Sequence, residues 1–331
     1  MKLSAIVPVY NDALHLKSCL SALMSSSRVP DQIIVVDDSS TDDSVAFARE
    51  LGAQLVVLTG GPCGPARARN RGAEAATGDV LVFVDADVKV HSDTIALLER
   101  YLTDQPEIAA VFGSYDLQPT GQGIVSRYKN LVHHYVHQHA RREAFTFWAG
   151  CGAIRRQIFE QLGGFNEHYA FPSVEDIELG ARLRDIGLRV WLCPDVQVTH
   201  LKEWSLVSLL RSDIRDRAVP WTRLILHRRK LPNDLNVDTA SRQSALAAWV
   251  GLITLVSGFY YPWAWLVTLS SVLVVFLLNA SLYKFFAQQG GIVLAFAGAG
   301  LHVLYLLYSS AIFGGMFVLS RFNERLVDKS I

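Results

Sequence analysis

The sequence has little of several features that would point to a particular partner or compartment. Its 331 residues carry 31 basic and 31 acidic side chains, so no net charge favours nucleic acid, and we expect no nucleic-acid partner. The four cysteines are scattered without a Cys-x-x-Cys pair, which argues against a disulfide framework or a zinc site. The amino terminus lacks the long apolar core of a signal peptide, so we expect the first domain to lie in the cytoplasm.

Charged residues are absent between Arg242 and Lys284. That length allows two membrane spans of about 20 residues each, near 245–259 and 263–283. Residues 291–319 give a further candidate span. Basic residues before the first span place the amino-terminal domain inside, but three spans would put the basic tail outside, so the number of spans stays open between two and four. The expected location is the inner (plasma) membrane, with several passes.

Four regions follow from these patterns. Residues 1–203 read as a globular domain and residues 244–320 as membrane helices, with a charged tail over 321–331. Residues 204–243 mix leucine, isoleucine and tryptophan with arginine and end their basic run at Lys230, a mixture that suits a helix lying in a membrane interface. A solvated basic face is the alternative for this segment.

Short apolar runs alternate with helical patterns in the first domain. The runs at 3–9, 33–36, 55–58 and 80–84 contain valine, isoleucine and leucine and read as buried strands. Alternating strands and helices predict an α/β fold with a doubly wound, mostly parallel sheet.

The stretch from residue 60 to residue 87 reads as a binding site. A glycine- and proline-rich loop leads into a helix that carries Arg67 and Arg69, and guanidinium groups at a helix amino end suit a diphosphate. The next strand ends in Asp85 and Asp87, an oxygen-ligand spacing that suits Mg²⁺ or Mn²⁺. The plainer alternative is a turn, where aspartate is common. Small residues further on, Gly150 and Gly152, suggest close approach of backbone to a bound sugar.

Four motifs in order carry a family resemblance: Val7-Pro8-Val9-Tyr10-Asn11, Val36-Asp37-Asp38-Ser39-Ser40, Ala68-Arg69-Asn70-x-Gly72 and Asp85-Ala86-Asp87. Together they resemble the motifs of family-2 glycosyltransferases. The resemblance implies a GT-A fold and a nucleotide-sugar donor. It implies that Asp38 reads the base, that Pro8 and Tyr10 line the base pocket, and that Asp85 lies near the nucleotide with Asp87 on the metal.

The second half of the domain completes this resemblance. In the family, a Glu-Asp pair such as Glu175-Asp176 supplies the catalytic base, and we take Asp176 as the candidate base. The alternative is that both carboxylates only favour a helix amino end, each by about 0.3–1 kcal/mol. A histidine like His200 recurs in the family and could contact the diphosphate or metal, with an ordinary hydrogen-bonded side chain as the equal alternative.

These observations predict a membrane-anchored, inverting glycosyltransferase with a lipid or lipid-linked acceptor. The alternatives are extension of a surface polysaccharide or glycolipid, and a scaffold that binds nucleotide sugars without turnover. A scaffold would keep its cellular role after Asp87→Asn or Asp176→Asn. The Gln-x-x-Arg-Trp motif of related processive synthases is not matched around Trp221, which argues against long-chain polymer synthesis. The sequence leaves the oligomeric state open.

Overall fold

The computed structural model describes residues 1–229 and 238–322. They divide into two compact units. The first comprises Met1–Gly121 and His137–Glu203, and the second comprises Gln122–Val136 and residues 204–322. Lys230, expected in the interfacial segment, and residues 323–331 of the expected charged tail lie outside the described residues.

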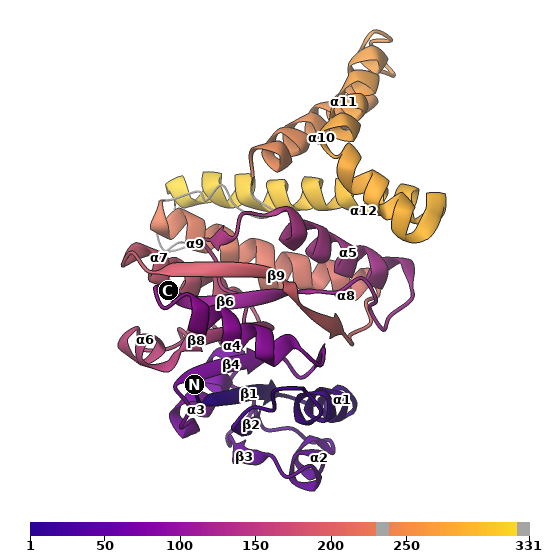
Figure 1. Ribbon diagram of the computed structural model, residues 1–331. Helices are drawn as coiled ribbons and strands as arrows, with labels where there is room; N and C mark the ends of the chain where they lie inside the picture. Colours follow the sequence, from indigo (N-terminus) through magenta and orange to yellow (C-terminus); the bar gives the residue numbers. More distant parts are fainter. Residues whose placement is uncertain (230–237, 323–331) are drawn as a thin grey trace. The chain divides into compact units, whose positions relative to one another are not determined.

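The strands of the first unit, within the described residues, form one nine-stranded sheet. Its order is β3-β2-β1-β4-β8-β6-β9-β5, with β7 beside β9. The strands from β3 to β9 in this order are labelled in Figure 1. The first four strands run parallel, whereas β8 enters antiparallel between β4 and β6. The α/β class expected from the sequence is therefore confirmed. The strands are β1 (Leu3–Val9), β2 (Gln32–Asp37), β3 (Gln54–Val57), β4 (Val80–Val84), β5 (Val88–Val90), β6 (Ile108–Tyr115), β7 (Glu143–Ala144), β8 (Cys151–Arg155) and β9 (Arg189–His200).

Two apolar cores cover the two faces of this sheet. Successive strand residues point to opposite faces, so Val7 packs in one core and Ile6 in the other. Helices α1, α2 and α4 cover the Val7 face, and α3, α6 and α7 cover the Ile6 face. All five residues of β4 are buried, as expected for a strand covered on both sides. The helices are α1 (Ala13–Met24), α2 (Ser44–Glu50), α3 (Pro65–Ala75), α4 (Thr94–Asp104), α6 (Arg156–Gln161) and α7 (Glu175–Asp185).

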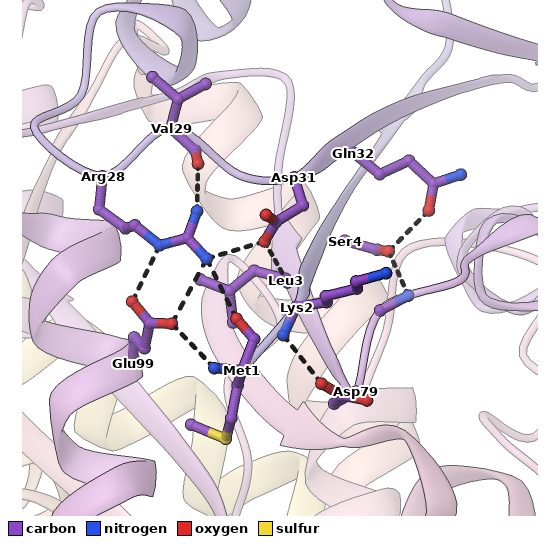
Figure 2. Close-up of polar contacts among 11 residues, drawn as sticks. Met1, Lys2, Leu3, Ser4, Arg28, Val29, Asp31, Gln32, Asp79 and Glu99 are labelled. Carbon is purple, nitrogen blue, oxygen red and sulfur yellow. Dashed lines mark hydrogen bonds and ion pairs between the residues drawn. The ribbon is translucent and has the colours of Figure 1, made fainter.

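A polar network fixes the start of β1 (Figure 2). Arg28 donates from Nε to Glu99 (2.9 Å) and from Nη2 to Asp31 (2.7 Å). The same Asp31 carboxylate accepts the backbone N–H of Leu3 at 2.8 Å. The network therefore joins the first strand to the segment before β2 and to α4.

The second unit is helical. It contains most of α5 (Ile124–His139), then α8 (Leu206–Arg211), a π-helix (Ser212–Ala218) and α9 (Val219–Arg228). Helices α10 (Thr239–Ser257) and α11 (Ala264–Leu278) pack along each other as a hairpin (Figure 1), and α12 (Ala280–Phe322) follows. A buried cluster joins α5 to α12 through Tyr128, Leu131 and Phe286.

Helix α12 is the one helix, among residues 1–229 and 238–322, that is long and apolar enough to cross a membrane. Its 43 residues are broken at Gly290 and Gly291, where the backbone leaves the helical region. Helix α11 has 15 residues and is about 22 Å long at 1.5 Å per residue, which is shorter than a bilayer core of about 30 Å. The span expected over 263–283 is thus interrupted after Leu278.

Candidate active site

The carboxyl ends of β1, β2 and β4 meet at one edge of the sheet, because these strands are parallel neighbours. Pro8 is half-buried there, and the following Tyr10 is 49% exposed, so its ring is accessible. Asp38 follows β2 and is buried, and Asp85 follows β4. The sheet therefore brings the predicted donor-binding residues of three separate motifs to one edge.

Asp38 holds the glycine-rich loop in this structure. Its carboxylate accepts the backbone N–H groups of Cys63 (2.9 Å) and Gly64 (2.8 Å). Gly64 has a φ of +90°, and a Cβ there would lie 2.4 Å from the carbonyl oxygen of Ala170, so only glycine fits. A carboxylate has about four lone-pair sites, so these two contacts leave Asp38 further capacity to accept hydrogen bonds. Base recognition by Asp38 stays a prediction.

Arg69 lies at the centre of the site. Arg69 is a buried residue of α3. Its Nη2 donates a hydrogen bond to Asp85 (2.6 Å), and its Nη1 donates one to Glu175 (2.7 Å). Its guanidinium also lies 5.5 Å from the ring centre of Phe165. Burial acts to lower the pKa of Arg69, but the charges of Asp85 and Glu175 raise it, so the side chain stays a cation. Arg69 therefore joins the end of β4 to the start of α7.

The other two arginines of α3 do not join this cluster. Arg67 is exposed, with its Nε 4.0 Å from Glu167, and Arg71 pairs with Glu74 on the surface. Of the two arginines predicted to bind the donor, Arg67 remains open to solvent, whereas Arg69 is already held by two carboxylates.

Asp87 and His200 come together through a strand pairing that the sequence does not reveal. Strand β5 runs antiparallel to β9 and places Val88 opposite His200. His200 Nε2 then lies 3.6 Å from the Asp87 carboxylate, and the imidazole stacks on Tyr115 with ring centres 4.4 Å apart. Burial acts to raise the pKa of Asp87, but the hydrogen bond and charge of His200 lower it, so the carboxylate stays ionised.

Asp87 and His200 alone contribute two side chains that could hold a divalent cation. In the described part of the chain, no group of three or more histidine, cysteine or acidic side chains is arranged to hold a metal by itself. Mg²⁺ and similar cations are usually held by one or two carboxylates plus substrate phosphates. Asp87, with His200 beside it, could supply the protein ligands of such a site, and substrate phosphates would supply the others.

Glu175 and Asp176 begin α7 and differ in their surroundings. Glu175 is buried, and its second oxygen accepts the backbone N–H of Ser173 at 3.0 Å. Asp176 is half-buried, and its Oδ2 accepts the backbone N–H of Ala149 at 3.1 Å. The two adjacent carboxylates are therefore held differently, one against Arg69 and one beside the segment that leads into β8.

Two aromatic residues near this site were missed in the sequence. Trp148 packs edge-on to Tyr115, with ring centres 4.9 Å apart, and Tyr115 in turn stacks on His200. A Cβ at Gly150 would lie 2.5 Å from the Trp148 ring, and one at Gly152 would lie 2.5 Å from the Trp148 carbonyl oxygen. Contact with Trp148 accounts for these glycines in the structure, and the close approach to a bound sugar stays a prediction.

Comparison with known proteins identifies the class to which this fold belongs. Residues 4–163 match the family model for Glycosyl transferase family 2, and residues 129–203 match the model for the N-terminal domain of galactosyltransferase. The chain therefore contains a family-2 glycosyltransferase domain, as the motifs predicted.

Two curated relatives agree with this assignment. The chain is 28% identical over 211 residues to the O-antigen chain rhamnosyltransferase RfbN of Salmonella typhimurium, covering 60% of this chain and 66% of that protein. It is 34% identical over 125 residues to the uncharacterized glycosyltransferase YibD of Escherichia coli, covering 37% of this chain and 36% of that protein. The chain thus spans between about a third and two thirds of the length of these relatives.

Solved structures show the same GT-A fold. The mannosyltransferase PcManGT of Pyrobaculum calidifontis, solved with GDP-Man and Mn²⁺, matches with a TM-score of 0.55 at 19% identity and covers 94% of this chain and 86% of its own. GalNAc-T7, solved with UDP, GalNAc and Mn²⁺, matches with a TM-score of 0.52 at 16% identity. The match covers 68% of this chain and 48% of the GalNAc-T7 chain.

Proposed function

We propose that this protein is a membrane-associated, inverting glycosyltransferase that moves a sugar from a nucleotide-sugar donor to a lipid or lipid-linked acceptor. The observation that carries the proposal is the position of Arg69, which holds Asp85 and Glu175 beside Asp176. This arrangement brings a donor-binding edge and a carboxylate suited to proton transfer into one site.

The donor binds along the sheet edge. Tyr10 and Pro8 border the base, and Asp38 accepts a hydrogen bond from it while keeping the loop at Gly64 in place. Asp85, fixed by Arg69, lies towards the ribose, and the exposed Arg67 is available to the diphosphate. The PcManGT and GalNAc-T7 structures, which hold GDP-Man and UDP respectively, support a nucleotide donor.

Asp87 and His200 are the residues that would hold a divalent cation, Mg²⁺ or Mn²⁺. Such an ion, when bound, supplies positive charge that stabilises the departing diphosphate. Tyr115 orients the His200 ring by stacking on it. The Mn²⁺ in the PcManGT and GalNAc-T7 structures supports a divalent cation in this reaction.

Asp176 acts as the general base. The acceptor hydroxyl attacks the anomeric carbon, its proton passes to the Asp176 carboxylate, and the bond from that carbon to the diphosphate oxygen breaks to release nucleoside diphosphate. One displacement inverts the configuration and needs no covalent enzyme intermediate. Glu175 acts with it as a positioning group, since its carboxylate is held by Arg69 and Ser173.

A membrane acceptor explains why the chain continues into apolar helices. Helix α12 is long enough to cross a bilayer, and large apolar side chains are exposed along α10 and α11. O-antigen synthesis, named for RfbN, is consistent with a lipid-linked acceptor. We place the protein in the inner membrane as a multi-pass protein with its catalytic domain in the cytoplasm.

Nucleoside diphosphate release by the detergent-purified chain tests this function. The assay compares a panel of nucleotide sugars, with Mg²⁺ or Mn²⁺, in the presence and absence of membrane lipid extract. We expect release with one donor that requires both the metal and the lipid. Equal release with water-soluble acceptors alone would refute the lipid acceptor, and donor binding without any release would favour the scaffold.

A further inference from the structure

A cavity of about 440 Å³ lies inside the second unit, and none of the residues assigned above lines it. Residues of α5, the π-helix, α9, α10 and α12 line it. Much of its wall is aromatic, formed by Tyr128, Trp221, Trp249, Tyr305 and Phe313. Its volume is within the range of about 300–1,000 Å³ seen for ligand sites, and such sites are mostly apolar with a few polar groups.

The polar part of this cavity is cationic. Arg217 lines it from the π-helix, and its side chain makes no hydrogen bond or ion pair with any residue of the described chain. Arg242, in the first turn of α10, also lines the cavity. Guanidinium groups bind phosphate oxygens through paired N–H donors, so two of them on one cavity favour a phosphate group.

The acidic residue in the wall does not cancel this charge. Asp213 is buried and is paired with the ammonium group of Lys129. Its other oxygen accepts the hydroxyl of Tyr308 at 2.6 Å. The cavity therefore keeps the guanidinium charge of Arg217, and Arg242 adds a second guanidinium group to its wall. The π-helix that carries both Asp213 and Arg217 is a rare element that is often found at functional sites.

Apolar side chains are exposed on the helices that border the cavity. On α10, Leu246 is 68% exposed, Ile253 61% and Val256 60%, and α12 is the long apolar helix of the chain. Basic pockets among membrane helices are typical binding places for anionic lipid headgroups. A water-soluble phosphate would use only the cationic part of such a cavity, whereas a lipid would also use its aromatic wall.

We propose that this cavity binds a lipid that carries a phosphate group. The phosphate lies against Arg217 and Arg242, and the first part of the hydrocarbon chain lies against Trp249 and Phe313. This inference extends the proposed function, because the lipid is either the phosphate-bearing acceptor or an anionic lipid of the bilayer. Both sources share the chemistry that the cavity recognises.

Lipid retention by the detergent-purified full chain, measured by native mass spectrometry, tests the site. The probes are a polyprenyl phosphate, phosphatidylglycerol, the matching uncharged polyprenol and inorganic phosphate. Arg217→Gln removes the charge and Ala245→Phe fills the cavity. Arg215→Gln and Ala247→Phe are the matched controls, because they lie on the same two helices but do not line the cavity. Melting temperatures confirm that each variant is folded.

We expect Arg217→Gln to lower retention of the phosphate lipid by about 10- to 100-fold, the effect of losing a hydrogen bond to a charged group. Ala245→Phe should also lower retention, because its ring takes the space of the lipid. Both controls retain the lipid as the unmodified protein does. Preference for polyprenyl phosphate identifies the acceptor as the source, and preference for phosphatidylglycerol identifies a bilayer lipid. Wild-type retention by either folded cavity variant, or equal retention of the polyprenol, overturns the proposal.

The same preparations separate this inference from the proposed enzyme activity. Lipid-dependent release of nucleoside diphosphate by a protein whose cavity variants still bind lipid normally would refute the cavity and leave the glycosyltransferase standing. Lipid retention that depends on Arg217 in a protein that releases no nucleoside diphosphate with any donor would refute the enzyme and support the cavity.

Discussion

The carboxylate of Asp87 lies 3.6 Å from Nε2 of His200, although the two residues belong to motifs far apart in the chain. The antiparallel pairing of β5 with β9 produces this contact, because Val88 is opposite His200. A backbone hydrogen bond of 2.8 Å from Leu201 to the carbonyl oxygen of Asp87 holds the two segments at this point. The proposed metal role of His200 can be tested separately from the one proposed for Asp87.

Substitution of His200 should weaken metal binding more than it destabilises the fold. His200→Gln keeps a polar side chain of similar reach but loses the imidazole that lies beside Asp87 and stacks on Tyr115. We expect the Mn²⁺ concentration for half-maximal nucleoside diphosphate release to rise by about 10- to 100-fold. His168→Gln is the control, because that histidine is exposed and bonds only locally to Asn166. An unchanged Mn²⁺ requirement would assign His200 a packing role.

Loss of Arg69 should destabilise the first unit. Arg69→Gln leaves the buried carboxylate of Glu175 without its cationic partner, which typically costs about 3–5 kcal/mol of unfolding free energy. Arg71→Gln, on the same helix, removes only a surface pair with Glu74 and should cost less than about 1 kcal/mol. Thermal unfolding in detergent measures both. Equal melting temperatures for the two variants would contradict the central position of Arg69.

Asp176 and Glu175 should give different results when neutralised. Asp176→Asn removes the proposed base, so we expect kcat to fall by about 10²- to 10⁴-fold while donor affinity and melting temperature change little. Glu175→Gln removes the buried carboxylate that pairs with Arg69, so it should lower the melting temperature as well as the activity. Single-turnover sugar transfer, donor titration and thermal unfolding measure these effects. A larger loss of kcat in Glu175→Gln than in Asp176→Asn would exchange the two roles.

A glycine substitution should test the loop that Asp38 holds. Gly64→Ala adds a Cβ that would lie 2.4 Å from the carbonyl oxygen of Ala170, whereas Gly60→Ala meets nothing within 4 Å. Both positions have positive φ, and such sparsely populated backbone conformations cost about 1–3 kcal/mol for alanine. We therefore expect Gly64→Ala to weaken donor binding about tenfold more than Gly60→Ala, since a shift of 1.4 kcal/mol is tenfold. Calorimetric donor titration measures the difference, and equal effects would show backbone strain alone.

The network at Arg28 should make the first unit sensitive to acid (Figure 2). The Leu3 N–H and Arg28 lower the pKa of Asp31, and Arg28 lowers the pKa of Glu99. In the unfolded chain the carboxyl pKa is about 3.9 for aspartate and about 4.3 for glutamate. The network therefore stabilises the protein above these pH values, and this stabilisation is lost as the pH falls through the lower pKa values of the folded state.

Arg28→Gln should therefore cost about 0.5–1 kcal/mol at pH 7, because the pairs are partly exposed, and should lose less stability than the unmodified protein between pH 5 and pH 3. Arg49→Gln is the control, at an exposed position. Thermal unfolding at pH 3, 5 and 7 measures both variants. Parallel pH profiles for Arg28→Gln and the unmodified protein would show that the network does not couple to pH.

The sequence predicted the elements whose signal is local. The run of buried residues in β4 and the motif order identified the sheet edge with Asp38, Asp85 and Asp87, because a buried strand and its polar end are adjacent in the chain. The glycine- and proline-rich loop before Arg67 indicated a helix for the same reason, and α3 begins there at Pro65.

Contacts between distant segments were not predictable in this way. Strand β5 has three residues, too few to show a period, so its pairing with β9 and the contact of Asp87 with His200 had no local signal. The sequence also gave no sign that β8 runs antiparallel to β4, since an apolar run has no direction. We expected Arg69 to bind a diphosphate. Its ion pairs with Asp85 and Glu175 could not be predicted, because only the folded chain brings these distant residues together.

Nucleoside diphosphate release by Asp87→Asn, compared with Asp104→Asn, tests the central claim most directly. Asp104 is an exposed carboxylate at the end of α4, so its substitution should leave activity unchanged. We predict that Asp87→Asn lowers lipid-dependent release by about 10²-fold or more at saturating Mn²⁺, while the protein keeps its melting temperature. Release by folded Asp87→Asn at the rate of Asp104→Asn would contradict the assignment of this sheet edge as the site of sugar transfer.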